Sequence, residues 1–217
     1  MDVLELLRLA LPVMLRGLGQ TLLFALASMF FGLVLGFALA IARITDWRIV
    51  RAVAAAYVSL MRGTPLLVQI FVIYYGLPGM GIEFSPTGAG ILALSLNAGA
   101  YLSESIRGAV LAVRRDQWAA SYSLGLSYAQ TLRHIVIPQA LRSAVPAISN
   151  TLLSLIKDTS LVSVITVAEL MLTTKEMIAV TFRPLPLYMT AAVIYWLISL
   201  GFEALQRRME RRLQASA

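Results

Sequence analysis

The side chains of this sequence that could do chemistry are polar and ionisable ones embedded in long apolar stretches. Asn150, Ser154 and Asp158 recur every four residues, and on a helix this spacing forms one polar stripe. Lys157 directly precedes Asp158. A carboxylate and an ammonium group in such a place can border a path for a charged, polar substrate, or they can neutralise each other as an internal ion pair. Both interpretations of the Lys157–Asp158 pair stay open from the sequence.

A second polar group surrounds a predicted break in an apolar helix. Arg62 stands two residues before the Thr64-Pro65 dipeptide, and proline disfavours helix at the residue before it. Further along, Glu104 and Arg107 are three residues apart, which favours a structural salt bridge on one helix face. The candidate residues of a polar path are Arg62, Thr64, Gln69, Glu104, Asn150, Ser154, Lys157, Asp158 and Ser160.

The composition of the chain places these residues in a membrane. Its 217 residues are 59% hydrophobic and 13% charged, with a mean hydropathy of +0.80. Soluble domains are about 45–50% apolar and about 25% charged, and a soluble fold of this length could not bury so much apolar surface. With 0 Cys and 1 His, the chain has little to catalyse with, so we predict no enzyme activity, no cofactor and no metal site in it.

Five stretches are long enough to cross a bilayer, which takes about 20 apolar residues. We predict an all-α integral membrane protein with transmembrane helices at 17–43, 52–77, 87–113, 138–165 and 184–205, forming one domain over 17–205. In the first helix, Gly32 and Gly36 belong to a small-residue stripe that lets helices approach closely, either within the chain or between subunits. Arg62 in the second helix either extends to the membrane surface or faces a cavity.

Basic residues are distributed unequally between the ends of these stretches, so the net charge of +7 reports membrane topology and not nucleic-acid binding. One side carries ten of them: Arg43, Arg48, Arg51, Arg114, Arg115, Arg133, Arg207, Arg208, Arg211 and Arg212. The other side carries Arg8, Arg16, Lys175 and Arg183. Because cytoplasmic loops are enriched in Lys and Arg, we predict that the N-terminus lies outside and the C-terminus in the cytoplasm.

The segment 116–138, between the third and fourth predicted helices, is too polar to span a membrane. Asp116 can cap a short helix that Gly125 would end in a left-handed turn. Ser127 and Gln130 then form a capping box for a second short helix. Two short helices that meet at a glycine form a compact protrusion on the cytoplasmic face. It would serve as an interface for a cytoplasmic partner or lie on the lipid surface.

This protrusion resembles the coupling motif of ABC-importer permeases, E-A-A-x-x-x-G followed by I-x-L-P. Here the motif is represented by Ala119-Ala120-Ser121, by Gly125 and by Ile135-Val136-Ile137-Pro138, with Ala119 in place of the glutamate. The resemblance implies that the segment contacts an ATPase. The residues it assigns to that contact are Gln117, Trp118, Ala119, Ala120, Gly125, Leu126, Ser127, His134 and Pro138.

Two further motifs, Arg62-Gly63-Thr64-Pro65-Leu66 and Lys157-Asp158-Thr159-Ser160-Leu161, are similar to those of the polar amino-acid uptake branch, the histidine, glutamine, arginine and cystine type. The resemblance implies a five-helix type I permease in a bacterial inner membrane. Its implied partners are a second permease subunit (the same chain or a paralogue), a cytoplasmic ATPase dimer, an external amino-acid-binding protein, a polar amino acid and membrane lipid. ATP and Mg would bind the ATPase, since this chain has no G-x-x-x-x-G-K loop.

A self-contained secondary transporter or channel is the alternative function. Such transporters are commonly built from internal repeats, and the sequence shows none. A membrane-embedded enzyme is a weaker alternative, because His134 lies in the polar segment and suits a surface position better than a catalytic one.

The predicted orientation can be tested with single cysteines, because the natural chain contains 0 Cys. In intact cells, a membrane-impermeant maleimide should label Glu83→Cys from outside and should not label Tyr122→Cys. Permeabilised cells should label both variants, which controls for buried thiols. The reverse labelling pattern would contradict the orientation.

Overall fold

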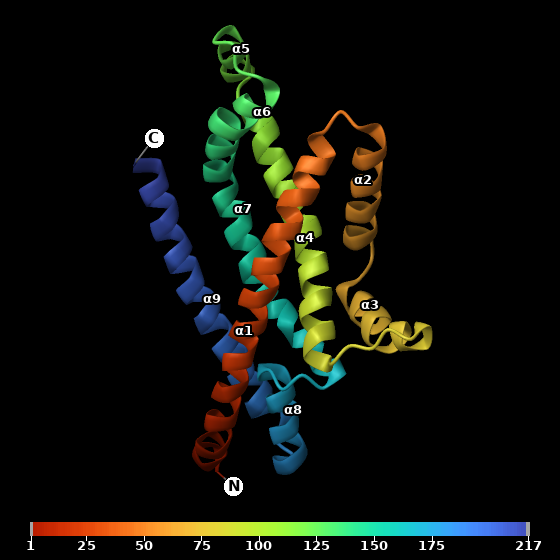
Figure 1. Cartoon of the computed structure of the whole chain (residues 1–217). Helices are drawn as coiled ribbons and strands as arrows, with labels where there is room; N and C mark the ends of the chain where they lie inside the picture. The colour runs from red at the N-terminus through yellow and green to blue at the C-terminus, as the bar shows by residue number, and fades with distance from the viewer. Residues whose placement is uncertain (1, 216–217) are drawn as a thin grey trace.

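The computed structural model describes residues 2–215, and within that range every regular element is helical. In chain order the elements are α1 (Val3–Ile44), α2 (Arg48–Gly63), α3 (Leu66–Phe71), η1 (Val72–Gly76), η2 (Leu77–Met80), α4 (Pro86–Ala112), α5 (Arg115–Ser123), α6 (Tyr128–Thr131), η3 (Leu132–Val136), α7 (Ile137–Asp158), η4 (Thr159–Ile165), α8 (Leu170–Thr181) and α9 (Pro184–Ala215). Figure 1 shows α1, α4 and α7 as a long bundle with α5 and α6 projecting from one end and α8 at the other.

Among the described residues, three helical stretches are long and apolar enough to cross a membrane: Val3–Ile44, Tyr128–Ile165 and Pro184–Arg211. Arg48–Gly63 and Leu66–Met80 provide a fourth if they count as one span, although they are bent by 106°. The break predicted at Pro65 is therefore confirmed. α4 is not in this set, because glycine, serine and Asn97 lower its hydropathy. It lies at the centre of the bundle, where it faces other helices (Figure 1).

The predicted start of the first helix at residue 17 is wrong, because α1 begins at Val3. Asp2 and Glu5 form a capping box: the Asp2 carboxylate accepts from the Val3 N–H, and the Asp2 N–H donates to Glu5. Residues of this first part of α1, including Leu6 and Met14, are buried against α8 and α9. The last helix also extends beyond the predicted residue 205, to Ala215.

The second short helix and the fourth predicted span are continuous in the structure. Tyr128–Ile165 forms one helical stretch, in which the π-helical turn η3 joins α6 to α7. Pro138 lies in the first turn of α7, where its missing N–H costs little. α7 itself ends at Asp158, and the remaining predicted span to residue 165 is the 3₁₀ helix η4.

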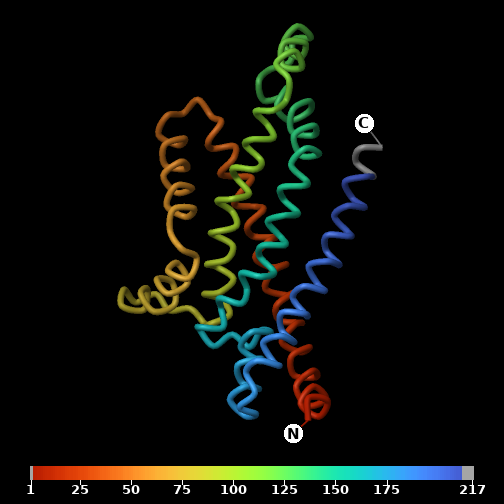
Figure 2. The backbone as a smooth tube through the Cα atoms, turned by 180° about the vertical axis from the view of Figure 1, so that it is seen from behind, coloured from red at the N-terminus to blue at the C-terminus, as the bar shows by residue number. Residues whose placement is uncertain are grey.

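The small-residue stripe of α1 packs against α4 within the chain. A Cβ atom at Gly36 would lie 2.8 Å from the Cβ atom of Leu102 and 3.0 Å from the carbonyl oxygen of Gly99. At Gly32 it would lie 3.2 Å from the Cβ atom of Ala98. Figure 2, seen from behind, also shows α1 crossing directly against α4. Of the two interpretations of this stripe, packing within the chain is confirmed.

Replacing Gly36 with Ala should destabilise the protein, because the added methyl group would press on the Gly99 backbone and on Leu102. Overpacking of this kind costs about 1–3 kcal/mol. Gly19→Ala is the matched control, since nothing lies within 4 Å of a Cβ atom there. Heating the purified protein in detergent and measuring the fraction left monodisperse should give a lower midpoint for Gly36→Ala only. Equal midpoints for both variants would contradict the close approach.

Candidate functional site

The break between α2 and α3 is held by two amide side chains. The Gln69 Nε2 group donates to the Met61 carbonyl at 2.8 Å and to the Thr64 carbonyl at 3.1 Å, and it contacts the Thr64 hydroxyl at 2.9 Å. From α4, Asn97 Nδ2 donates to the Met61 carbonyl at 3.2 Å and to Gln69 Oε1 at 3.1 Å. These bonds satisfy carbonyls that the interrupted helix leaves unpaired, so the buried Gln69 fixes the break.

A cavity of about 680 Å³ opens beside this break. Three elements line it: the α2–α3 junction, the middle of α4 and the second half of α7. The lining residues are Arg62, Gly63, Thr64, Pro65, Leu66, Asn97, Ala98, Tyr101, Asn150, Thr151, Ser154, Leu155 and Asp158. The cavity therefore combines one acidic group, one guanidinium and several amides and hydroxyls with an apolar remainder.

Five of the nine candidate path residues line this cavity. The stripe of α7 contributes Asn150, Ser154 and Asp158, as its four-residue spacing predicts. Arg62 and Thr64 come from the α2–α3 junction. These five therefore lie around one space, although they come from parts of the chain almost a hundred residues apart.

The other four candidates lie elsewhere. Gln69 is buried behind the break, and Glu104 belongs to an arginine cluster described below. Ser160 lies in η4, outside the lining. Lys157 is exposed and also outside the lining.

The internal Lys157–Asp158 ion pair, one of the two interpretations of these residues, is absent from the ion pairs formed by the side chains of residues 2–211. Successive residues of a helix point about 100° apart, so Lys157 points away from the stripe that carries Asp158. The Asp158 carboxylate likewise accepts no hydrogen bond from the described part of the chain, and Lys157 acts on it only as a charge at a distance.

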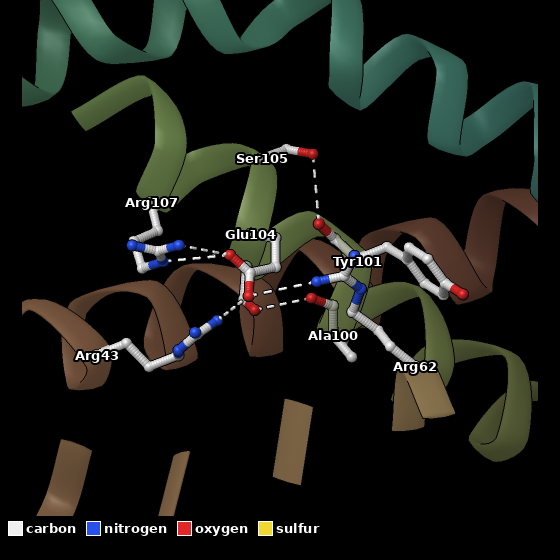
Figure 3. Close-up of polar contacts among 8 residues, drawn as sticks. Arg43, Arg62, Ala100, Tyr101, Glu104, Ser105 and Arg107 are labelled. Carbon is white, nitrogen blue, oxygen red and sulfur yellow. Dashed lines mark hydrogen bonds and ion pairs between the residues drawn. The ribbon is translucent and has the colours of Figure 1, made fainter. Parts of the chain in front are cut away.

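Glu104 forms the centre of a cluster with three arginines. Arg107 contacts it at 2.9 Å, as the three-residue spacing predicts, and Arg62 contacts it at 3.3 Å. Arg43, at the end of α1, also donates to Glu104. Figure 3 shows Arg43 and Arg107 on one side of the carboxylate and Arg62 on the other, where its guanidinium lies 5.3 Å from the centre of the Tyr101 ring.

Sequence reasoning missed three contributors to this region. Arg43 stands at the end of an apolar stretch, so the sequence places it among the basic residues of one membrane side and not in a polar cluster. Tyr101 and Thr151 were not proposed for the cavity. Tyr101 lies four residues after Asn97 on α4, so the same four-residue spacing that identified the stripe of α7 could have found it.

The polar segment forms the predicted helix–glycine–helix turn. Gly125 has φ +79°, and the Leu126 N–H donates to the Ser121 carbonyl at 3.1 Å. Ser127 and Gln130 form the predicted capping box. Arg114, and not Asp116, is the N-cap of α5; Asp116 lies in the first turn and pairs with Arg114.

Most of the residues assigned to the ATPase contact are exposed in this protrusion: Gln117, Ala119, Ala120, Gly125, Ser127, His134 and Pro138. Leu126 and Trp118 are partly buried, and Trp118 stacks on Tyr128 with ring centres 5.8 Å apart. Trp118 therefore holds α5 to α6, and the exposed residues form the outer surface.

Apolar spans, an interrupted helix and a polar cavity at that interruption are typical of membrane transport proteins. The family described as binding-protein-dependent transport system inner membrane components matches residues 32–215. The chain belongs to this family, as its sequence motifs predict.

Curated relatives and solved structures agree with this assignment. The L-cystine transport system permease protein TcyB of Bacillus subtilis is 42% identical over 93% of this chain and 87% of its own length. The glutamine transport system permease protein GlnP of Escherichia coli K12 is 37% identical over 94% of both chains.

Among solved structures, an amino acid ABC transporter crystallised with histidines superposes with a TM-score of 0.92 at 34% identity, covering 98% of this chain and 99% of that one. The inward-facing MetNI methionine transporter has a TM-score of 0.78 at 20% identity, over 94% of this chain and 97% of its own, and shows the shared fold alone.

Proposed function

We propose that this chain is the permease subunit of an ATP-driven importer and forms the path for a polar amino acid. The observation that carries this proposal is the Asp158 carboxylate, which faces the cavity without an ion-pair partner among the side chains of residues 2–211. An unpaired carboxylate inside a bundle is costly, and such residues commonly mark substrate pathways. The alternative of a self-contained transporter or channel is not favoured, because the relatives are permease subunits of ABC systems.

The chemistry of the cavity suits a zwitterion. Asp158 can accept from the α-ammonium group, and Arg62 can donate to the carboxylate. Asn150, Ser154 and Thr64 can bind a polar side chain. The volume of about 680 Å³ is within the usual range of small-molecule sites. Cystine, glutamine and histidine, which appear in the names of the similar proteins, are all zwitterions.

The placement in the membrane follows from the charge distribution. We count α4 as a span although it is less apolar than the others, because its polar residues face the cavity and neighbouring helices. The five spans are then α1, the bent α2–α3 pair, α4, α7 and α9. The N-terminus would lie outside a bacterial inner membrane and the C-terminus in the cytoplasm. In Figure 1 the N-terminus and the protrusion lie at opposite ends of the bundle, which supports this orientation.

The partners follow from the family. A second permease subunit and an external binding protein would complete the importer, and a cytoplasmic ATPase dimer would contact the exposed surface of α5, Gly125 and α6. The chain is not itself an enzyme, since ATP hydrolysis in such transporters belongs to a separate subunit.

Replacing Asp158 with Asn should lower transport about tenfold, because the amide oxygen can still accept a hydrogen bond but no longer carries the negative charge that attracts an ammonium group. Transport of labelled L-glutamine, L-cystine, L-arginine and L-histidine into proteoliposomes checks this, together with basal ATPase activity, which should persist. Glu203→Gln is the matched control, because this exposed carboxylate pairs with Arg207 on α9, away from the cavity. Transport at the wild-type rate for every amino acid would remove Asp158 from the path.

Gly125→Val should weaken both ATPase binding and transport, because a β-branched residue is strongly disfavoured at φ +79°. A Cβ atom there would meet nothing within 4 Å, so the effect would come from the backbone and not from a clash. Gly125→Asn should largely preserve both activities, since Asn tolerates the left-handed region. Ala119→Glu, which restores the motif, should be tolerated. Co-purified ATPase measures the contact, and unchanged binding by Gly125→Val would exclude the protrusion as the coupling element.

A further inference from the structure

The three arginines around Glu104 are not equivalent. Arg43 and Arg107 have 16% and 31% of their side chains exposed, whereas Arg62 has 44% exposed. The contact of Arg62 with the carboxylate, at 3.3 Å, is the longest of the three. Arg62 is also the one member of the cluster that lines the cavity. It is therefore the guanidinium with the weakest hold on Glu104 and with access to a ligand.

The cluster can lose Arg62 without leaving a carboxylate unpaired. Arg107 donates to one oxygen of Glu104 through two nitrogens, and Arg43 donates to the other oxygen. Both oxygens therefore keep a partner when Arg62 departs. Tyr101, whose ring lies beside the Arg62 guanidinium, also lines the cavity and offers the cation a surface on the cavity side.

We propose that Arg62 exchanges between two carboxylates, that of Glu104 when the cavity is empty and that of the amino acid when it is filled. Arg43 and Arg107 set the balance, because they compete with Arg62 for Glu104. Glu104 thus acts as a positioning residue: it pairs with Arg62 while the cavity is empty and does not touch substrate. The inference rests on the proposed function and adds a consequence: filling the cavity breaks the Arg62–Glu104 link between α2 and α4.

The exchange predicts opposite effects for two variants that alter the same cluster. Glu104→Gln frees Arg62 and should lower the Kd for amino acid about two- to fivefold, the range expected for a partly exposed ion pair. Arg107→Gln removes a competitor, so Glu104 should hold Arg62 more tightly and the Kd should rise by a similar factor. The measurement is equilibrium binding of the labelled L-amino acid that is transported, from the four named above, to the permease–ATPase complex in nanodiscs without binding protein.

The Arg62→Gln background separates exchange from the general effect of charge. Removing Glu104 or Arg107 also changes the electrostatic potential in the cavity, and that effect would persist without Arg62. On the exchange mechanism, both shifts in Kd should largely disappear when Arg62 is Gln. If Glu104→Gln does not fold, Arg107→Gln still tests the exchange when its Kd is compared with Arg62 present and with Arg62→Gln. Glu104 keeps its contact with Arg43 in both of these proteins.

The possible failures are distinguishable. Unchanged Kd values in the single variants, or shifts of the same size in the Arg62→Gln background, would overturn the exchange while transport of the amino acid leaves the proposed function standing. A complex that transports the amino acid but shows no saturable binding would also overturn the exchange and leave the proposed function standing. If none of the four amino acids is transported or bound, the proposed function fails and the exchange with it.

Discussion

Hydrogen bonding of an interrupted backbone inside an apolar bundle is the constraint on which the cavity depends. Pro65 ends α2, and the carbonyls near the break need donors from the protein because hydrocarbon supplies none. Gln69 and Asn97 provide them. The bend of 106° that results turns α3 away from α2 and opens a polar space between α2, α4 and α7. Without those two amides, the Met61 and Thr64 carbonyls would lie unpaired in an apolar bundle, and the break at Pro65 would be costly.

The carboxylates of the bundle divide by whether they are satisfied. Glu169 is fully buried but accepts from the Met171 and Leu172 N–H groups and from the Tyr195 hydroxyl, so it caps α8 and joins it to α9. Glu104 has its arginines. Asp158 has no such partner in the described part of the chain, and it is the one that faces the cavity. Glu169 and Glu104, which hold elements of the fold together, thus have hydrogen-bond donors on their carboxylates. The absence of such donors at Asp158 among the described residues therefore points to a ligand and not to a structural role.

Much of this arrangement could be predicted from the sequence because it depends on local spacing. The four-residue stripe of α7, the break at Pro65, the Glu104–Arg107 pair and the turn at Gly125 all follow from residues close together in the chain. The start of α1, the participation of Arg43 and the position of Lys157 could not, because they depend on how distant segments pack or on which way one side chain points. The low hydropathy of α4 has a related cause. A central helix faces other helices and not lipid, so it can cross the membrane with more polar residues than a hydropathy criterion allows.

The continuous helical stretch from Tyr128 to Ile165 has a mechanical consequence. At 1.5 Å per residue, its 38 residues make a rod of roughly 57 Å that begins at the protrusion and carries Asp158 near its far end. A push applied at the protrusion would tilt the end that carries Asp158, because no loop interrupts the helical stretch between them. The π-helical turn η3 is one of the less regular parts of this backbone, and it lies close to the protrusion. Bending at η3 would therefore take up part of such a push before it reached the cavity.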